Sequence, residues 1–218
     1  MIMQEEIPKI VQKLSSERFE AYRRRGESDE QVLARVCWNA ALSEALFPCL
    51  QGLEVGFRNS LHQAIAGLFG GGDWILRDST FEPKEKEMHA AAVQQLNTRG
   101  KPLTAGYLIA ELKFGFWTSL VDARYHRLWP KIIKAVVPAM PNSIRTRGEI
   151  SKRMNEVRFL RNAVSHHHSI WHWPDLEKRH ETIHTLINWI EPAYGAFVKG
   201  QDRFAEVLKS GAEVYLRR

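Results

Sequence analysis

The chain has 218 residues, of which 44% are hydrophobic and 26% charged, so it has the length and composition of a globular domain with a buried core. Two cysteines are too few for a disulfide framework, and no apolar run reaches the length of a membrane span. The net charge of +6 and the pI of about 9.4 favour polyanionic partners. The acidic N-terminus does not resemble a signal peptide, so we expect a cytoplasmic protein with no membrane partner.

Helical periodicity and stop signals predict an all-α chain, organised as a single domain over residues 1–218. Pro48 is expected to separate two helices, and Pro192 is expected to kink a third. No alternating strand pattern, internal repeat or low-complexity tract is present. The predicted helices cover residues 7–25, 30–47, 49–69, 84–98, 104–121, 125–137, 145–167, 175–198 and 201–216.

One charged pair lies inside the predicted helix 49–69. Glu54 and Arg58 are four residues apart, a spacing at which opposite charges meet on a helix. Because apolar residues flank both, the sequence predicts a partly buried structural ion pair.

The most unusual stretch, residues 155–174, combines fixed cations with a run of histidines at the end of an apolar-periodic helix. Arg161, Asn162 and His166 fall within six residues. An arginine stays protonated at any working pH, whereas a histidine changes charge near neutrality. This combination suits a reaction in which a phosphate gains negative charge while a proton moves.

A helical wheel separates two faces of this segment. Val157, Leu160 and Val164 share an apolar direction, while Arg158, Asn162 and His166 form an i, i+4, i+8 stripe on the far side. Arg161 lies nearer the apolar face, so it needs either a buried partner or a place in a second interface.

Several other chemistries find less support. The histidines at 166–168, His172 and the pair His180/His184 suggest a metal site, but no Cys-x-x-Cys or His-Glu-x-x-His motif accompanies them. The pair has helical ligand spacing but no obvious third ligand, so neither a metal nor another cofactor is expected. The glycines at 70–72 follow a helix and lack the lysine of a phosphate-binding loop. Ser165 beside His166 lacks the strand–turn–helix context of a nucleophile elbow.

Metal-independent RNA cleavage fits the residue types best, since it requires a base for the 2′-hydroxyl proton and a cation for the phosphorane-like state. An alternative remains open on chemistry alone. In it Arg161 pairs with Glu54, Asn162 caps the helix, and the histidines only pack.

The chain resembles the Abi-like family of abortive-infection proteins within the HEPN superfamily. The HEPN signature is an Arg followed after four to six residues by a His, commonly with Asn directly after the Arg. Arg161, Asn162 and His166 fit it with a spacing of four, and His167 completes the His–His pair of the Abi-like version, which Ile170–Trp171 follows. The chain differs at 168–169, where an arginine often follows the pair.

Other segments extend the resemblance over residues 14–192. They are residues 14–22, Trp38–Asn39, residues 53–59, residues 108–117 and residues 188–190.

The resemblance implies an all-α HEPN-like helical bundle with additional N- and C-terminal helices. It also implies a metal-independent endoribonuclease of anti-phage defence, a growth-arresting toxin that forms a homodimer with two motifs in one cleft. His166 would act as general base or acid, Arg161 would stabilise the phosphate charge, and Asn162 would orient one of them. Arg158 and His167 are second-rank catalytic or RNA-binding candidates. RNA and an antitoxin or second defence subunit are the expected partners; a non-catalytic module that binds RNA or protein is the alternative.

Overall fold

The structure is a computed structural model that describes residues 4–77 and 81–216. All of the regular secondary structure in these residues is helical, which confirms the all-α prediction. The α-helices are α1 (Ile7–Leu14), α2 (Ser16–Glu20), α3 (Asp29–Phe69), α4 (Pro83–Thr98), α5 (Ala105–Glu111), α6 (Phe114–Ser119), α7 (Trp129–Val136), α8 (Arg147–Ser165), α9 (Leu176–Ile190), α10 (Pro192–Lys199) and α11 (Phe204–Ser210). Short 3-10 helices are η1 (Gln4–Glu6), η2 (Gly72–Leu76), η4 (Ala123–Tyr125), η5 (Asn142–Ile144) and η6 (Glu213–Tyr215).

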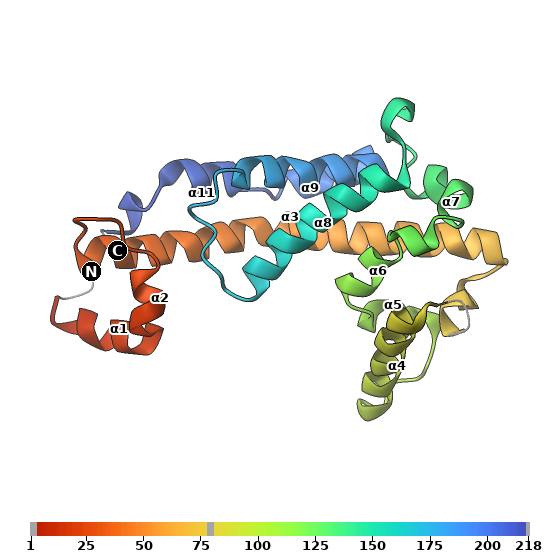
Figure 1. Cartoon of the computed structure of the whole chain (residues 1–218), viewed down its shortest axis with the longest axis horizontal. Helices are drawn as coiled ribbons and strands as arrows, with labels where there is room; N and C mark the ends of the chain where they lie inside the picture. Colours follow the sequence, from red (N-terminus) through yellow and green to blue (C-terminus); the bar gives the residue numbers. More distant parts are fainter. Residues whose placement is uncertain (1–3, 78–80, 217–218) are drawn as a thin grey trace.

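Helix α3 is the axis on which the rest of the fold is built (Figure 1). A reciprocal capping box begins it: the Ser28 hydroxyl accepts from the Gln31 amide, and the Gln31 side chain accepts from the Ser28 amide. Gly70 ends it in the left-handed conformation, φ 76°.

The prediction that Pro48 divides this segment is wrong, because α3 continues through Pro48 for 41 residues. A proline inside a helix removes one backbone hydrogen bond and costs about 3 kcal/mol. Leu46, Cys49, Leu50 and Leu53 are all buried around it. Burial of apolar side chains at about 25 cal/mol per Å² outweighs this cost, so tertiary packing overrides the local signal.

Four other predicted helices are interrupted, and the last of them, segment 201–216, divides at Gly211, where φ is 65°. Segment 7–25 divides at Ser15, where φ is 67° and the side chain accepts a hydrogen bond from the Arg18 amide to cap α2. Segment 104–121 divides at Leu112, whose backbone is extended while its carbonyl accepts from the Trp117 indole. Segment 175–198 divides at Glu191, because Pro192 begins a new helix rather than kinking the old one.

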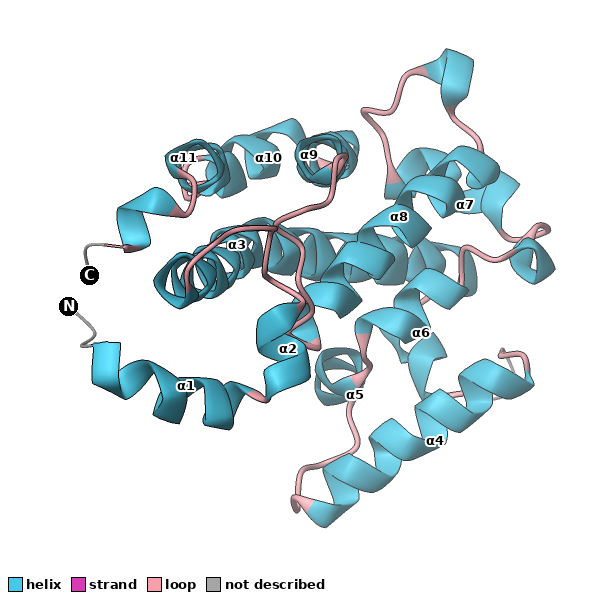
Figure 2. Ribbon diagram, turned by 60° about the vertical axis from the view of Figure 1, so that its left-hand side comes forward, coloured by secondary structure: helices cyan, strands magenta, loops and turns pink. Residues whose placement is uncertain are grey.

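The remaining helices surround α3 on several sides (Figures 1 and 2). Helices α9 and α10 run along one side of it, and α11 continues this layer. Helices α1 and α2 lie against one end, α4 to α6 lie towards the other, and α8 crosses between α6 and α9. Across the described part of the chain, no helix has both the length and the apolar character required to cross a membrane.

Candidate functional site

Helix α8 carries the predicted motif at its C-terminal end. Its N-terminus is capped by the Thr146 hydroxyl, which accepts from the Glu149 amide at 3.1 Å. The side chains that α8 buries repeat at helical spacing: Ile150, Met154, Val157, Leu160 and Ala163. Asn162 and His166 fall on the opposite, exposed side, as the helical wheel predicts, and Arg158 is half-buried.

The three histidines form the turn that ends α8. The His167 amide donates to the Val164 carbonyl at 3.1 Å, and the His168 amide donates to the Ala163 carbonyl at 2.9 Å. These two bonds define a Schellman motif, whose left-handed position is usually glycine. Here His167 holds that position with φ 57°. All three histidines are exposed, and the rings of His166 and His168 lie 6.1 Å apart.

Replacing His167 with glycine is therefore expected to stabilise the protein by about 0.5–1 kcal/mol, since glycine adopts a positive φ without a Cβ clash. Denaturant unfolding measures the change. His172→Gly is the control, because His172 is exposed in the same loop and has no positive φ. If His167→Gly instead loses stability, contacts of the imidazole stabilise the wild type by more than the strain of its positive φ costs.

Hydrogen bonds of one buried side-chain amide hold the loop after the motif against α3. Asn39 of α3 accepts from the Ile170 and Trp171 amides at 2.7 and 3.1 Å through its Oδ1 atom. Its Nδ2 atom donates to the His168 carbonyl at 3.3 Å. The Arg18 guanidinium of α2 also donates to the His167 carbonyl. The position of the histidines is therefore set from α2 and α3 as well as from α8.

Ile170 and Trp171, the apolar and aromatic residues that follow the histidine run, anchor the N-terminal helices. Ile170 is fully buried. The Trp171 ring lies 4.8 Å from the guanidinium groups of both Arg24 and Arg35, and it stacks on Tyr22 at 6.5 Å. Arg35 also forms a bidentate ion pair with Glu27. These two residues thus connect the main hydrophobic core to the small core under α1 and α2.

Arg161 lies in the wall of a groove between α3 and α8. Its guanidinium is 3.6 Å from the Glu54 carboxylate, and both side chains are partly exposed. The groove has a volume of about 320 Å³ and is also lined by Phe47, Val55 and Ser165. Arg161 also lines a second pocket of about 290 Å³, together with Met88, Glu111, Lys113 and Phe116.

The predicted Glu54–Arg58 ion pair is wrong. Among the described residues Glu54 pairs with Arg161, whereas the Arg58 guanidinium donates to Asn59 Oδ1 at 3.4 Å. The i, i+4 spacing permits a pair only if no better partner faces the carboxylate, and α8 supplies one. An exposed pair of this kind contributes at most about 1 kcal/mol, so it holds Arg161 only weakly.

Arg161 and His166 do not converge within one chain. Five residues of helix separate them by about 7.5 Å along the axis and by roughly 140° around it. Arg161 faces the α3 groove, whereas His166 is exposed at the helix end. One chain therefore offers a cation and an imidazole on different faces of α8.

An aromatic surface beside the motif has no counterpart in the sequence prediction. Phe159 is 61% exposed and stacks on Trp173 with ring centroids 5.4 Å apart. The Arg179 guanidinium lies 5.6 and 5.2 Å from these two rings. Its hydrogen bond lowers the pKa of Asp175. The spacing of Phe159 on α8 relative to the buried stripe would have indicated its exposure.

The His166–His168 run does not belong to any group of three or more potential metal ligands in the described residues. Such a group occurs elsewhere and comprises Cys49, His180 and His184. The prediction of no third ligand for the histidine pair missed Cys49, because that residue lies on α3, far away in sequence.

The fold and the site together define an all-helical protein that displays an Arg-Asn-Ala-Val-Ser-His motif at the end of one helix. Residues 8–172 match the Abi-like protein family, and because this range covers most of the chain, the chain belongs to that family. Family membership associates the chain with abortive-infection defence. No curated protein and no solved structure matches the chain.

Proposed function

We propose that this chain is a HEPN-type, metal-independent endoribonuclease that acts in abortive infection against phage. The observation that carries the proposal is the motif at the end of α8. Asn162 and His166 are exposed, and Asn39 holds the loop that follows His166 through residues 168 and 170. An exposed histidine in a backbone held in this way is accessible to a substrate.

The reaction assigned to the site is an internal transesterification of RNA. His166 removes the proton from a 2′-hydroxyl, and the oxygen attacks the adjacent phosphorus. The 5′-oxygen leaves with a proton from a second acid, so the products are a 2′,3′-cyclic phosphate and a 5′-hydroxyl. Arg161 stabilises the added negative charge of the transition state, and Asn162 orients one of the two groups.

The divergence of Arg161 and His166 on α8 supports a homodimer. A second copy could supply the arginine that faces the histidine of the first, so that two composite sites form in one cleft. In this arrangement the Arg161–Glu54 pair is a resting contact, which a phosphate competes with readily because the pair is weak and partly exposed.

The RNA surface in this proposal combines basic and aromatic groups. Arg158 and His167 flank the motif, and the exposed Phe159 ring with Arg179 beside it offers a stacking platform for a base. The net charge of +6 would draw RNA to the protein. The activity would be a growth-arresting toxin in the cytoplasm, restrained by an antitoxin or a second defence subunit.

The second candidate is a non-catalytic HEPN module that binds RNA or protein. The Arg161–Glu54 ion pair favours it, since an arginine with a carboxylate partner can serve the fold alone. In this case the histidines would be surface groups without a chemical role.

The test is incubation of the purified protein with total cellular RNA in EDTA, with the fold followed by circular dichroism. The double variant Arg161→Ala/His166→Ala is the inactive comparison, and His172→Ala is the matched control in the same loop. Fragments with 2′,3′-cyclic phosphate ends from the wild type and the control only would support the ribonuclease. A folded, RNA-free wild type that does not cleave, with or without Mg²⁺, would favour the module.

A further inference from the structure

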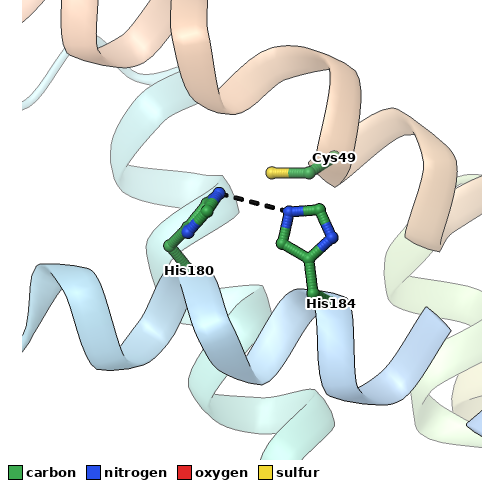
Figure 3. Close-up of side chains that lie close together, drawn as sticks. All are labelled: Cys49, His180 and His184. Carbon is green, nitrogen blue, oxygen red and sulfur yellow. Dashed lines mark hydrogen bonds between the residues drawn. The ribbon is translucent and has the colours of Figure 1, made fainter. Parts of the chain in front are cut away.

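A second cluster of reactive side chains lies away from the motif, where α9 packs on α3. Cys49 projects from α3 towards His180 and His184, which lie one turn apart on α9 (Figure 3). Asp202, which precedes α11, completes the cluster by contacting both imidazoles through one carboxylate oxygen. Three separate elements thus bring four potential ligands together.

The distances within the cluster allow its ligands to converge on one metal ion after small shifts; Asp202 lies outside the group whose ligand atoms all fall within 4.8 Å of one another, and it joins that group through its contacts to the two imidazoles. The Nε2 atoms of His180 and His184 lie 3.2 Å apart, and the ligand atoms of both and Cys49 Sγ lie within 4.8 Å of one another. Two nitrogens bound to one tetrahedral Zn²⁺ at about 2.05 Å are about 3.3 Å apart. Asp202 Oδ2 lies 2.5 Å from each nitrogen, so it would move outward by under about 1 Å to share an ion.

The side chains are buried and held in orientation by their neighbours. Cys49 is 1% exposed, and the side chains of His180, His184 and Asp202 are 13%, 13% and 9% exposed. The Phe204 ring stacks on the His180 ring at 4.3 Å, and Asp202 Oδ1 accepts from the Phe204 amide at 2.8 Å. Orientation of ligands by such outer contacts is typical of metal sites.

Burial and the contacts within the cluster also shift the pKa values of these groups in the metal-free protein. Burial lowers the pKa of His180. Burial opposes ionisation of Asp202, but the Phe204 amide and the two imidazoles outweigh it and lower its pKa. Burial and the Asp202 charge raise the pKa of Cys49 to about 12, so an incoming cation must displace the thiol proton.

We propose that Cys49, His180, His184 and Asp202 form a structural Zn²⁺ site that fastens α9 and the start of α11 to α3. One thiolate, two imidazoles and one carboxylate suit Zn²⁺, and four protein ligands leave no open position for catalysis. The site is separate from the motif. Cys49 points towards α9, whereas the α3 residues of the Arg161 groove, among them Gln51 and Glu54, lie on the opposite side of the helix.

The test measures metal in the full-length protein, prepared without a histidine tag. The wild type should hold close to one equivalent of Zn²⁺ by elemental analysis. Excess Zn²⁺ added to the metal-free protein, at 100 times the dissociation constant, should raise the melting temperature by roughly 5–10 °C. Substituted Co²⁺ should give an intense thiolate-to-cobalt absorption band in addition to its tetrahedral ligand-field bands.

Two cysteine variants on the same helix assign the ligand. Cys49→Ser should lose the thiolate band and most of the thermal shift, whereas Cys37→Ser should keep both, because Cys37 is exposed and outside the cluster. If Cys49→Ser fails to fold, the zinc content of the wild type and the rise of its melting temperature with Zn²⁺ test the proposal. A folded wild type with no bound metal and no shift would overturn the proposal, as would unchanged binding by Cys49→Ser.

Failure of this site and failure of the proposed ribonuclease are distinguishable. The proposed Zn²⁺ takes no part in RNA cleavage, so folded Cys49→Ser should cleave RNA at the wild-type rate. Metal binding by Arg161→Ala/His166→Ala should likewise be unchanged.

Discussion

His166→Ala is expected to reduce RNA cleavage by roughly 10²–10⁴-fold, because in the proposed mechanism it removes the group that takes the 2′-hydroxyl proton. The fold should remain intact, since His166 is exposed and its backbone amide, which bonds to the Asn162 carbonyl, is unchanged. The stability change should lie within about 0.5 kcal/mol. Initial rates of cleavage and denaturant unfolding of the same samples measure both quantities.

Arg161→Ala separates a catalytic from a structural arginine. If Arg161 stabilises the transition state, its loss should lower the cleavage rate by roughly 10²–10³-fold at a stability cost of at most about 1 kcal/mol. Glu54→Gln is the control, since it removes the ion pair but keeps the guanidinium. Equal effects of both variants on stability, with neither affecting cleavage, would assign Arg161 to the fold alone.

Mixing the two inactive single variants tests the composite site. If Arg161 of one chain faces His166 of the other, half of the randomly assembled dimers contain one intact site. Cleavage should then recover to roughly a quarter of the wild-type rate. Active single variants would refute the mechanism, whereas inactive singles that never complement would place both groups in the same chain.

The sequence predicted the helical class and the location of most helices, because hydrophobic periodicity carries that information. It failed where packing overrides a local signal. Pro48 breaks an isolated helix, yet the buried residues around it hold α3 together. Conversely, residues around Leu112 have good helical propensity, but an extended backbone there allows α5 and α6 to bury separate faces.

The sequence predicted only part of the candidate site. Spacing along α8 correctly predicted the exposure of Asn162 and His166, since a helical wheel needs no tertiary information. The partners from other helices were not accessible in this way. Glu54 opposite Arg161, and Cys49 opposite His180, come from contacts between segments that no spacing rule connects.

Asn39 is the partner of greatest consequence, and Asn39→Ala is expected to destabilise the protein by roughly 2–4 kcal/mol. The substitution removes three hydrogen bonds of a residue that is only 5% exposed. It also leaves the buried Ile170 amide without its acceptor, and such an unsatisfied group costs about 1–3 kcal/mol. Denaturant unfolding measures the loss.

The same substitution should lower the turnover number by roughly 10- to 100-fold at temperatures where the variant is folded. The Asn39 side chain fixes the loop that follows His166, and a displacement of about 1 Å in a catalytic group can cost 10²-fold in rate. Asn59→Ala, on an exposed position of the same helix, should change neither quantity.

Asn39→Asp distinguishes positioning from general loss of stability. The carboxylate retains an acceptor for the Ile170 and Trp171 amides but cannot donate to the His168 carbonyl. It should therefore recover only part of the stability, because a buried carboxylate is costly and its second oxygen faces the His168 carbonyl oxygen. Cleavage should recover in part, because the bonds to the Ile170 and Trp171 amides still hold the loop. Wild-type stability and turnover in Asn39→Ala would show instead that α8 alone positions His166, without help from α3.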